Sequence, residues 1–180
     1  MERNSGPTQV VRISVVMRDN PFQTFNQRIA ASTLGAALCS HTLHALDGFC
    51  FRLSGGRHSV TSLMTGLPLG MVTCRGAKSG IERTAPLLAI KDLVDSSRFA
   101  LIATNWGRTN YPAWYHNLKA HPKASCAIAG KVGHYVAHEA VGDEYSRFWD
   151  YAAGTYVGYP SYKGRISSRR IPIMVMTPVE

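Results

Sequence analysis

Short apolar runs, separated by glycine, proline and polar turns, dominate the chain from residue 69 to its end. Runs of about four to eight apolar and β-branched residues between turn signals are typical of β-strands. We therefore predict six strands, at residues 69–75, 83–90, 98–104, 125–128, 135–140 and 171–177. The glycines at 130 and 133 predict a turn over 130–133, which makes a hairpin of the fourth and fifth strands.

Three segments have the spacing of helices instead. Apolar residues recur at three- and four-residue steps through 21–53, and Ser54, Gly55 and Gly56 then supply a stop. Pro112 precedes a short helix predicted over 113–120, in which Trp114 and Asn117 share one face. A third helix is predicted over 142–156, because acidic residues in its first turn favour the helix dipole.

The order of these elements predicts the fold class. Strands and helices do not alternate, no repeat is present, and the links between strands are short. Such a pattern favours a mainly β protein with flanking helices, of the α+β class, in which a small antiparallel barrel has its helices outside. We expect one domain over 21–180, which includes an N-terminal helical segment at 21–55, and a loosely held extension at 1–20.

Charge and cysteine content narrow the function. A net charge of +9 indicates an anionic partner, which could be nucleic acid, a membrane surface or a polyanionic small molecule. No basic helix or aromatic RNA-binding motif is present, so we predict no nucleic acid partner. The four cysteines form no C-x-x-C pair, which favours free thiols and no metal site. We expect a cytoplasmic protein; contact of the apolar face of 21–53 with a membrane surface is the alternative.

Two segments carry candidate chemistry. The turn Gly76–Gly80, G-A-K-S-G, combines backbone freedom with Lys78 and suits a phosphate or carboxylate, although a plain hairpin would have the same sequence. Tyrosines at 156, 159 and 162 follow at three-residue spacing in a segment broken by glycine and proline. We predict a loop there that offers its phenols to a flat ligand, because such a loop is a poor place to bury three hydroxyls.

An ordered set of motifs resembles a known family. The set is G-A-K-S-G with Arg83 and Pro86, then A-T-N-W-G, P-A-W-Y-H-N-L-K-A-H-P, Y-V-G-Y-P-S-Y and R-I-P-I. It is similar to the deazaflavin-dependent nitroreductase and quinone reductase family, over the part of the chain from residue 43 to the end. The resemblance implies a split β-barrel, of the FMN-binding split-barrel type, that binds coenzyme F420. It also implies hydride transfer from the reduced coenzyme to a quinone, a nitroaromatic or an activated alkene.

The resemblance also implies roles for particular residues. The phosphate and glutamate tail of the coenzyme would meet Lys78, Ser79 and Arg83, with Ala77, Thr84, Ala85, Pro86 and Leu87 beside them. The deazaflavin would lie against Ile102, Ala103, Thr104, Asn105, Ala113, Trp114, Tyr115, His116 and Asn117. Tyr159, or failing it Tyr156, would donate a proton or hydrogen bond in catalysis, and Trp106, Tyr156 and Tyr162 would face the substrate.

The chain departs from the family pattern at two positions. Ala77 stands where the family usually has arginine, and we predict that Arg75, two residues earlier on an extended strand, takes over the contact with the tail. Trp106 stands where glycine is usual and would narrow the mouth of the site, which disfavours a bulky quinone.

Three alternatives stay open: an FMN-dependent barrel enzyme, a carrier that binds F420 without turning it over, and a basic nucleic-acid-binding barrel. The partner that we predict is a small-molecule hydride acceptor, for a monomer or a homodimer.

Overall fold

The computed structural model describes residues 68–179. The predicted extension at 1–20 and the helical segment at 21–55 lie outside these residues, as does any membrane contact made by 21–53. The predictions for these segments therefore stay predictions.

The described part of the chain is built on one antiparallel sheet of seven strands, in the order β2-β1-β5-β6-β7-β4-β3. The strands are β1 (Leu69–Arg75), β2 (Glu82–Leu88), β3 (Ile90–Lys91), β4 (Phe99–Ile102), β5 (Lys123–Ile128), β6 (Lys131–Glu139) and β7 (Ile173–Pro178). The sheet curves so that β2 contacts β4 without pairing with it. The predicted mainly β architecture, a split barrel, is confirmed.

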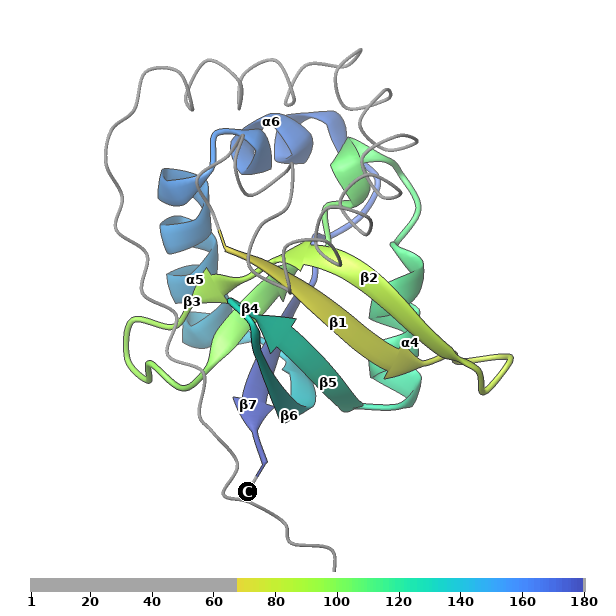
Figure 1. Cartoon of the computed structure of the whole chain (residues 1–180). Coiled ribbons are helices and arrows are strands. Elements are labelled where there is room, and N and C mark those ends of the chain that lie inside the picture. The colour runs from red at the N-terminus through yellow and green to blue at the C-terminus, as the bar shows by residue number, and fades with distance from the viewer. Residues whose placement is uncertain (1–67, 180) are drawn as a thin grey trace, which may run out of the picture.

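Helices lie outside this sheet (Figure 1). The helix α4 (Ala113–Ala120) packs against β1 and β6, whereas α5 (Gly142–Thr155) and α6 (Gly158–Arg165) contact each other and α5 also contacts β7. A single tight turn, η1 (Asn105–Gly107), follows β4 and contacts α6. The predicted bounds of α4 are confirmed, and α5 ends one residue before the predicted one.

Strands β4 and β7 separate two apolar cores. In β4, Phe99 and Leu101 pack into the core beneath α4, while Ala100 and Ile102 pack into the core beneath α5 and α6. Residues of β7 alternate in the same way. Because side chains of a strand alternate between faces, a strand with both faces covered has a continuous apolar sequence, as residues 99–103 do.

The structure corrects one predicted turn and one predicted strand. The hairpin between β5 and β6 turns at Ala129 and Gly130, whose φ angles of 51° and 78° fit a two-residue turn, so residues 131–133 already belong to β6. The expected strand at 83–90 is divided between β2 and β3 at Ala89, whose N–H donates to the Pro68 carbonyl.

The predicted tyrosine loop is also wrong, because residues 158–165 form helix α6. Pro160 is tolerated there since it stands in the first turn, where backbone N–H groups have no partner within the helix. Tyr159 and Tyr162 lie three residues apart on one face of α6, and together with Tyr156 they are buried in the core beneath it.

Candidate active site

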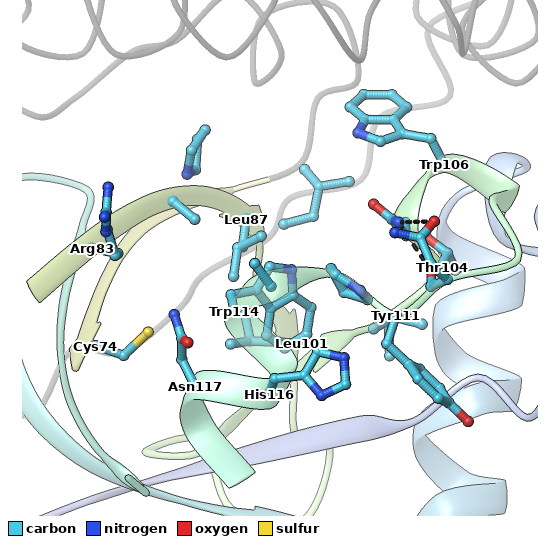
Figure 2. A pocket seen from close by; sticks show the side chains of 18 of the residues that line it. Cys74, Arg83, Leu87, Leu101, Thr104, Trp106, Tyr111, Trp114, His116 and Asn117 are labelled. Carbon is cyan, nitrogen blue, oxygen red and sulfur yellow. Dashed lines mark hydrogen bonds between the residues drawn. The ribbon is translucent and has the colours of Figure 1, made fainter. Parts of the chain in front are cut away.

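A cavity of about 1050 Å³ lies between β2, β4, α4 and the Asn105–Gly107 turn. Figure 2 shows that Arg83, Cys74 and Asn117 lie toward one end and Thr104 and Trp106 toward the other, with Leu87 and Trp114 between them. A cavity of this size accommodates a ligand larger than a typical metabolite. It brings the β1–β2 turn, the aromatic helix α4 and the tyrosines of α6 to one site.

Cationic side chains at the exposed end come from the β1–β2 turn and from the strand β2 that follows it. The N–H of Gly76 donates to the Ile81 carbonyl, and Gly80, with φ of 68°, donates to the Gly76 carbonyl, which closes the turn. Lys78 in the turn and Arg83 on β2 are both exposed and line the cavity. Two cations on hydrated side chains attract an anionic group at little desolvation cost.

Asn117 connects this turn to helix α4. Its side-chain Oδ1 accepts a hydrogen bond from the N–H of Ala77 at 2.9 Å. Its side chain also hydrogen-bonds the Cys74 thiol, although burial outweighs that bond and raises the pKa of Cys74. The position of the turn therefore depends on a side chain of the aromatic helix.

The middle of the cavity is apolar and aromatic. Trp114, on the same face of α4 as Asn117, lines it together with Pro86 and Leu87 from β2 and Leu101 from β4. The apolar residues of β2 and the tryptophan offer flat surfaces on which a conjugated ring can pack.

Three tyrosines form the buried end. The hydroxyls of Tyr156 and Tyr162 are 3.2 Å apart and hydrogen-bonded, and the ring of Tyr156 meets that of Tyr159 edge-on at 5.1 Å. Burial, and to a lesser degree the neighbouring Tyr156, raises the pKa of both Tyr159 and Tyr162. All three line the cavity. Neutral phenols at this end can donate hydrogen bonds but cannot serve as bases near neutral pH.

Most residues predicted for the site line this cavity. Three do not: Arg75, Ala103 and Tyr115. The guanidinium of Arg75 lies beside Gly80, Ala103 is fully buried, and the Tyr115 hydroxyl donates to Glu139 at 3.1 Å. The role of Arg75 at the coenzyme tail stays a prediction, without a cavity contact to support it. Gly76, from the turn that the sequence analysis proposed as a binding element, also lines the cavity. Lining residues that the sequence analysis did not assign to the site are Leu69, Cys74, Leu88, Leu101, Arg108, Asn110, Tyr111 and Pro112.

Comparison with known proteins shows the family of this chain. The model of the F420H(2)-dependent quinone reductase family matches residues 49–178. An F420H(2)-dependent quinone reductase of Mycobacterium tuberculosis is 30% identical over 105 residues, which cover 57% of this chain and 68% of that protein. The chain belongs to the F420H(2)-dependent quinone reductase family.

Solved structures agree with this membership. An F420-H2 dependent reductase (FDR-A) is 32% identical, with a TM-score of 0.54 over 61% of this chain and 93% of that one. A structure described as a domain-swapped dimer is also 32% identical, with a TM-score of 0.55 over 61% of this chain and 79% of that one. Like the family, this chain is an oxidoreductase.

Two further observations concern residues 68–179 only. No cluster of histidine, cysteine and carboxylate side chains there could hold a metal ion, and no helix there is long and apolar enough to cross a membrane. Cys74 and Cys126 are free and buried, as predicted for the cysteines; Cys39 and Cys50 lie outside the described residues.

Proposed function

We propose that this member of the family binds reduced F420 in the cavity and reduces a quinone there. The observation that carries the proposal is the continuity of one cavity from an exposed cationic turn to a buried cluster of neutral phenols. An extended ligand with an anionic tail and a flat ring matches the order of these environments along the cavity. The family's donor has this form.

The residues present fit such a coenzyme. Lys78 and Arg83 would meet the phosphate and carboxylates of its tail, with Ser79 beside them. Leu87 and Trp114 would pack against the ring, between the cationic and the phenolic ends. The volume of about 1050 Å³ leaves room for a small acceptor next to the coenzyme.

The reduced deazaflavin supplies the hydride, and this chain contributes position, exclusion of water and a proton or hydrogen bond. Holding donor and acceptor in contact contributes most, because it replaces an encounter in solution by a fixed geometry. Tyr159 is best placed for the remaining role: it is 4% exposed, lines the cavity, and its hydroxyl has no hydrogen-bond partner among residues 68–179. Since its pKa is raised, the phenol remains protonated and can donate to an acceptor oxygen that gains negative charge.

Spectroscopy and turnover test the proposal together. Purified protein is titrated with oxidised F420 and, separately, with FMN, to measure binding. The oxidation of reduced F420 is then followed by its change in absorbance in the presence of benzoquinone, nitroaromatic or enone acceptors. We expect F420 to bind in preference to FMN, and the quinone to be reduced. Binding of FMN alone would contradict the choice of coenzyme, and F420 binding without turnover of any acceptor would indicate a carrier.

Tyr159→Phe tests the phenol. We expect turnover with the quinone to fall about 100-fold, at the low end of what general acid catalysis contributes, because the hydride step keeps its geometry. The affinity for F420 should stay unchanged. Full turnover in Tyr159→Phe and in Tyr156→Phe would exclude a catalytic phenol at both positions.

The proposal also covers the cellular location, the oligomeric state and the range of acceptors. Location in the cytoplasm stays a prediction. A homodimer is supported by the 32% identical structure described as a domain-swapped dimer, and light scattering of the purified protein tests it. Nitroaromatics and activated alkenes are further acceptors that the turnover assay includes.

A further inference from the structure

We propose that Arg169 is a positioning residue: it holds the Asn105–Gly107 turn in a strained conformation that places Trp106 as a wall limiting the size of the acceptor. The proposal rests on the proposed function, since it names a selectivity of that same site. Arg169 itself lies outside the motifs that relate this chain to its family, although Ala103 and Thr104, whose carbonyls it contacts, are the first two residues of A-T-N-W-G.

The turn has an unusual backbone. Asn105, Trp106 and Gly107 have φ angles of 49°, 59° and 81°, so three consecutive residues adopt left-handed conformations. Asparagine and glycine tolerate this region, but a bulky residue such as tryptophan is a genuine outlier there. Residues in such conformations persist only where surrounding contacts hold them.

The guanidinium of Arg169 supplies those contacts. Its Nη1 donates to the Ala103 carbonyl at 3.2 Å, and its Nη2 donates to the carbonyls of Thr104 and Arg108, each at 3.0 Å. Its Cζ lies 4.7 Å from the centre of the Tyr111 ring. One side chain thus bonds to backbone on both sides of the turn, which a planar group with several donors can do and a single ammonium cannot.

Contacts from other elements brace the turn further. The Asn105 side-chain nitrogen donates to the Asn110 carbonyl at 3.0 Å. A methyl group on Gly107 would stand 3.4 Å from the Tyr162 ring and 3.5 Å from the Nε of Arg165, so helix α6 lies directly against the turn. Arg169 is nevertheless the side chain whose donors reach carbonyls both before and after it.

The conformation of the turn determines where the Trp106 ring lies. Its ring meets that of Tyr162 edge-on, with centroids 6.3 Å apart, and lines the cavity at the end opposite Arg83 (Figure 2). A rigid indole beside the phenols limits how far a bicyclic acceptor or one with an alkyl chain can enter. A monocyclic acceptor needs less of that space, so the wall should discriminate by size.

The experiment compares acceptors of two sizes in matched variants. The variants are Trp106→Gly, Arg169→Ala, Arg169→Lys, the double variant Trp106→Gly with Arg169→Ala, and the control Arg170→Ala. Arg170 is the next residue along, but it donates to the Ala140 carbonyl and stacks on Tyr145, away from the turn. For each, the kcat/KM for an alkylated naphthoquinone is divided by that for a benzoquinone.

We expect Trp106→Gly to raise this ratio by about tenfold or more, since a hydrophobic pocket discriminates by this amount for a small group. Arg169→Ala should raise the ratio in the same direction, Arg169→Lys less, and Arg170→Ala not at all. In the Trp106→Gly background, removal of Arg169 should leave the ratio unchanged, because its effect acts through Trp106. An unchanged ratio in Trp106→Gly, or an equal effect of Arg169→Ala in both backgrounds, would overturn the proposal.

Hydrogen exchange supplies a readout that needs neither coenzyme nor turnover. The N–H groups of Gly107 and Arg108 donate to the carbonyls of Thr104 and Asn105, and both should exchange faster in Arg169→Ala and Arg169→Lys than in Arg170→Ala. Equal exchange in all variants would show that Arg169 does not hold the turn. If none of the acceptors supports oxidation of reduced F420 by the wild type, the proposed function fails, while the exchange result still decides the role of Arg169.

Discussion

Asn117 joins the aromatic helix to the cationic turn, and its replacement by alanine tests whether that turn is a binding element. The variant removes the acceptor of the Ala77 N–H bond, which is 2.9 Å long and lies in an exposed setting. An exposed hydrogen bond of this kind contributes about 0.5–1.5 kcal/mol net. Helix α4 gains about 0.7 kcal/mol in return, because alanine is a better helix former than asparagine.

These two magnitudes separate binding from stability. The gain in the helix offsets most of the lost bond, so the free energy of unfolding should change by less than about 1 kcal/mol. The turn, however, loses its tether, and ordering it on binding then costs about the energy of that bond. The affinity for F420 should therefore fall about 2- to 10-fold, since 1.4 kcal/mol corresponds to a factor of ten.

Fluorescence titration of F420, together with thermal denaturation, measures both quantities. Lys119→Ala is the control on the same helix, because the Lys119 ammonium bonds Glu139 at 3.0 Å and does not reach the turn. If Asn117→Ala lowers the affinity for F420 no more than Lys119→Ala does, and its Tm is unchanged, the coupling of α4 to the turn is refuted. A large drop in Tm would show instead that Asn117 holds the fold.

Three further predictions test other parts of the structure. Lys78→Ala should weaken F420 binding about 3- to 10-fold and reduce its dependence on salt, as titrations at two ionic strengths would show, because Lys78 is exposed and its attraction is screened. Gly158→Ala should destabilise the protein by about 1–3 kcal/mol in denaturant unfolding, because the new methyl would stand 2.3 Å from the Tyr156 ring, whereas Gly154→Ala, with nothing within 4 Å, should not. Partial burial opposes ionisation of Glu144, but hydrogen bonds from a histidine and an arginine outweigh it and hold the pKa of its carboxyl below the usual 4.5. Its contribution to stability is thus present above about pH 4.5 and is lost as the pH falls through the lowered pKa, so Glu144→Gln should flatten the decline of Tm below pH 4.5.

The regular parts of the fold could be predicted because local signals and burial agree there. Strand β1 was predicted with its observed bounds, since alternation places Val72 and Cys74 in the core and Thr73 outside it. Helix α4 was predicted with its bounds because Pro112 fixes its start. Positions 99–103 form one apolar run, which could not reveal that the strand separates two cores.

The tyrosine segment was mispredicted because propensity and tertiary packing disagree. Gly158, Pro160 and Gly164 favour a turn in isolation, yet the apolar face formed by Tyr159 and Tyr162 is buried against the core, which stabilises the helix. The hydroxyls are accommodated because Tyr156 and Tyr162 bond each other and the cluster faces a cavity. The sequence indicated which tyrosines lie close together, but not that they also belong to the core.

The site residues that were missed lie next to those that were found. Cys74 precedes the cationic turn, and Tyr111 and Pro112 precede helix α4, so adjacency alone would have included them. Arg169 differs, because it lies more than 60 residues from the turn that it holds. Nothing in its local sequence indicates long-range bonds to backbone carbonyls, which follow only from the packing of the segment before β7 against the Asn105–Gly107 turn.

Under the proposed function, the two ends of the cavity have opposite requirements for water. An anionic tail is bound with the smallest desolvation cost by cations that stay hydrated, and Lys78 and Arg83 are exposed. Hydride transfer requires the opposite, because a dry site strengthens each hydrogen bond to developing charge, and Tyr159 is buried in the core beneath α5 and α6. Separation along one cavity satisfies both requirements, so substitutions at the turn should alter coenzyme affinity and its salt dependence, whereas substitutions at the phenols should alter turnover.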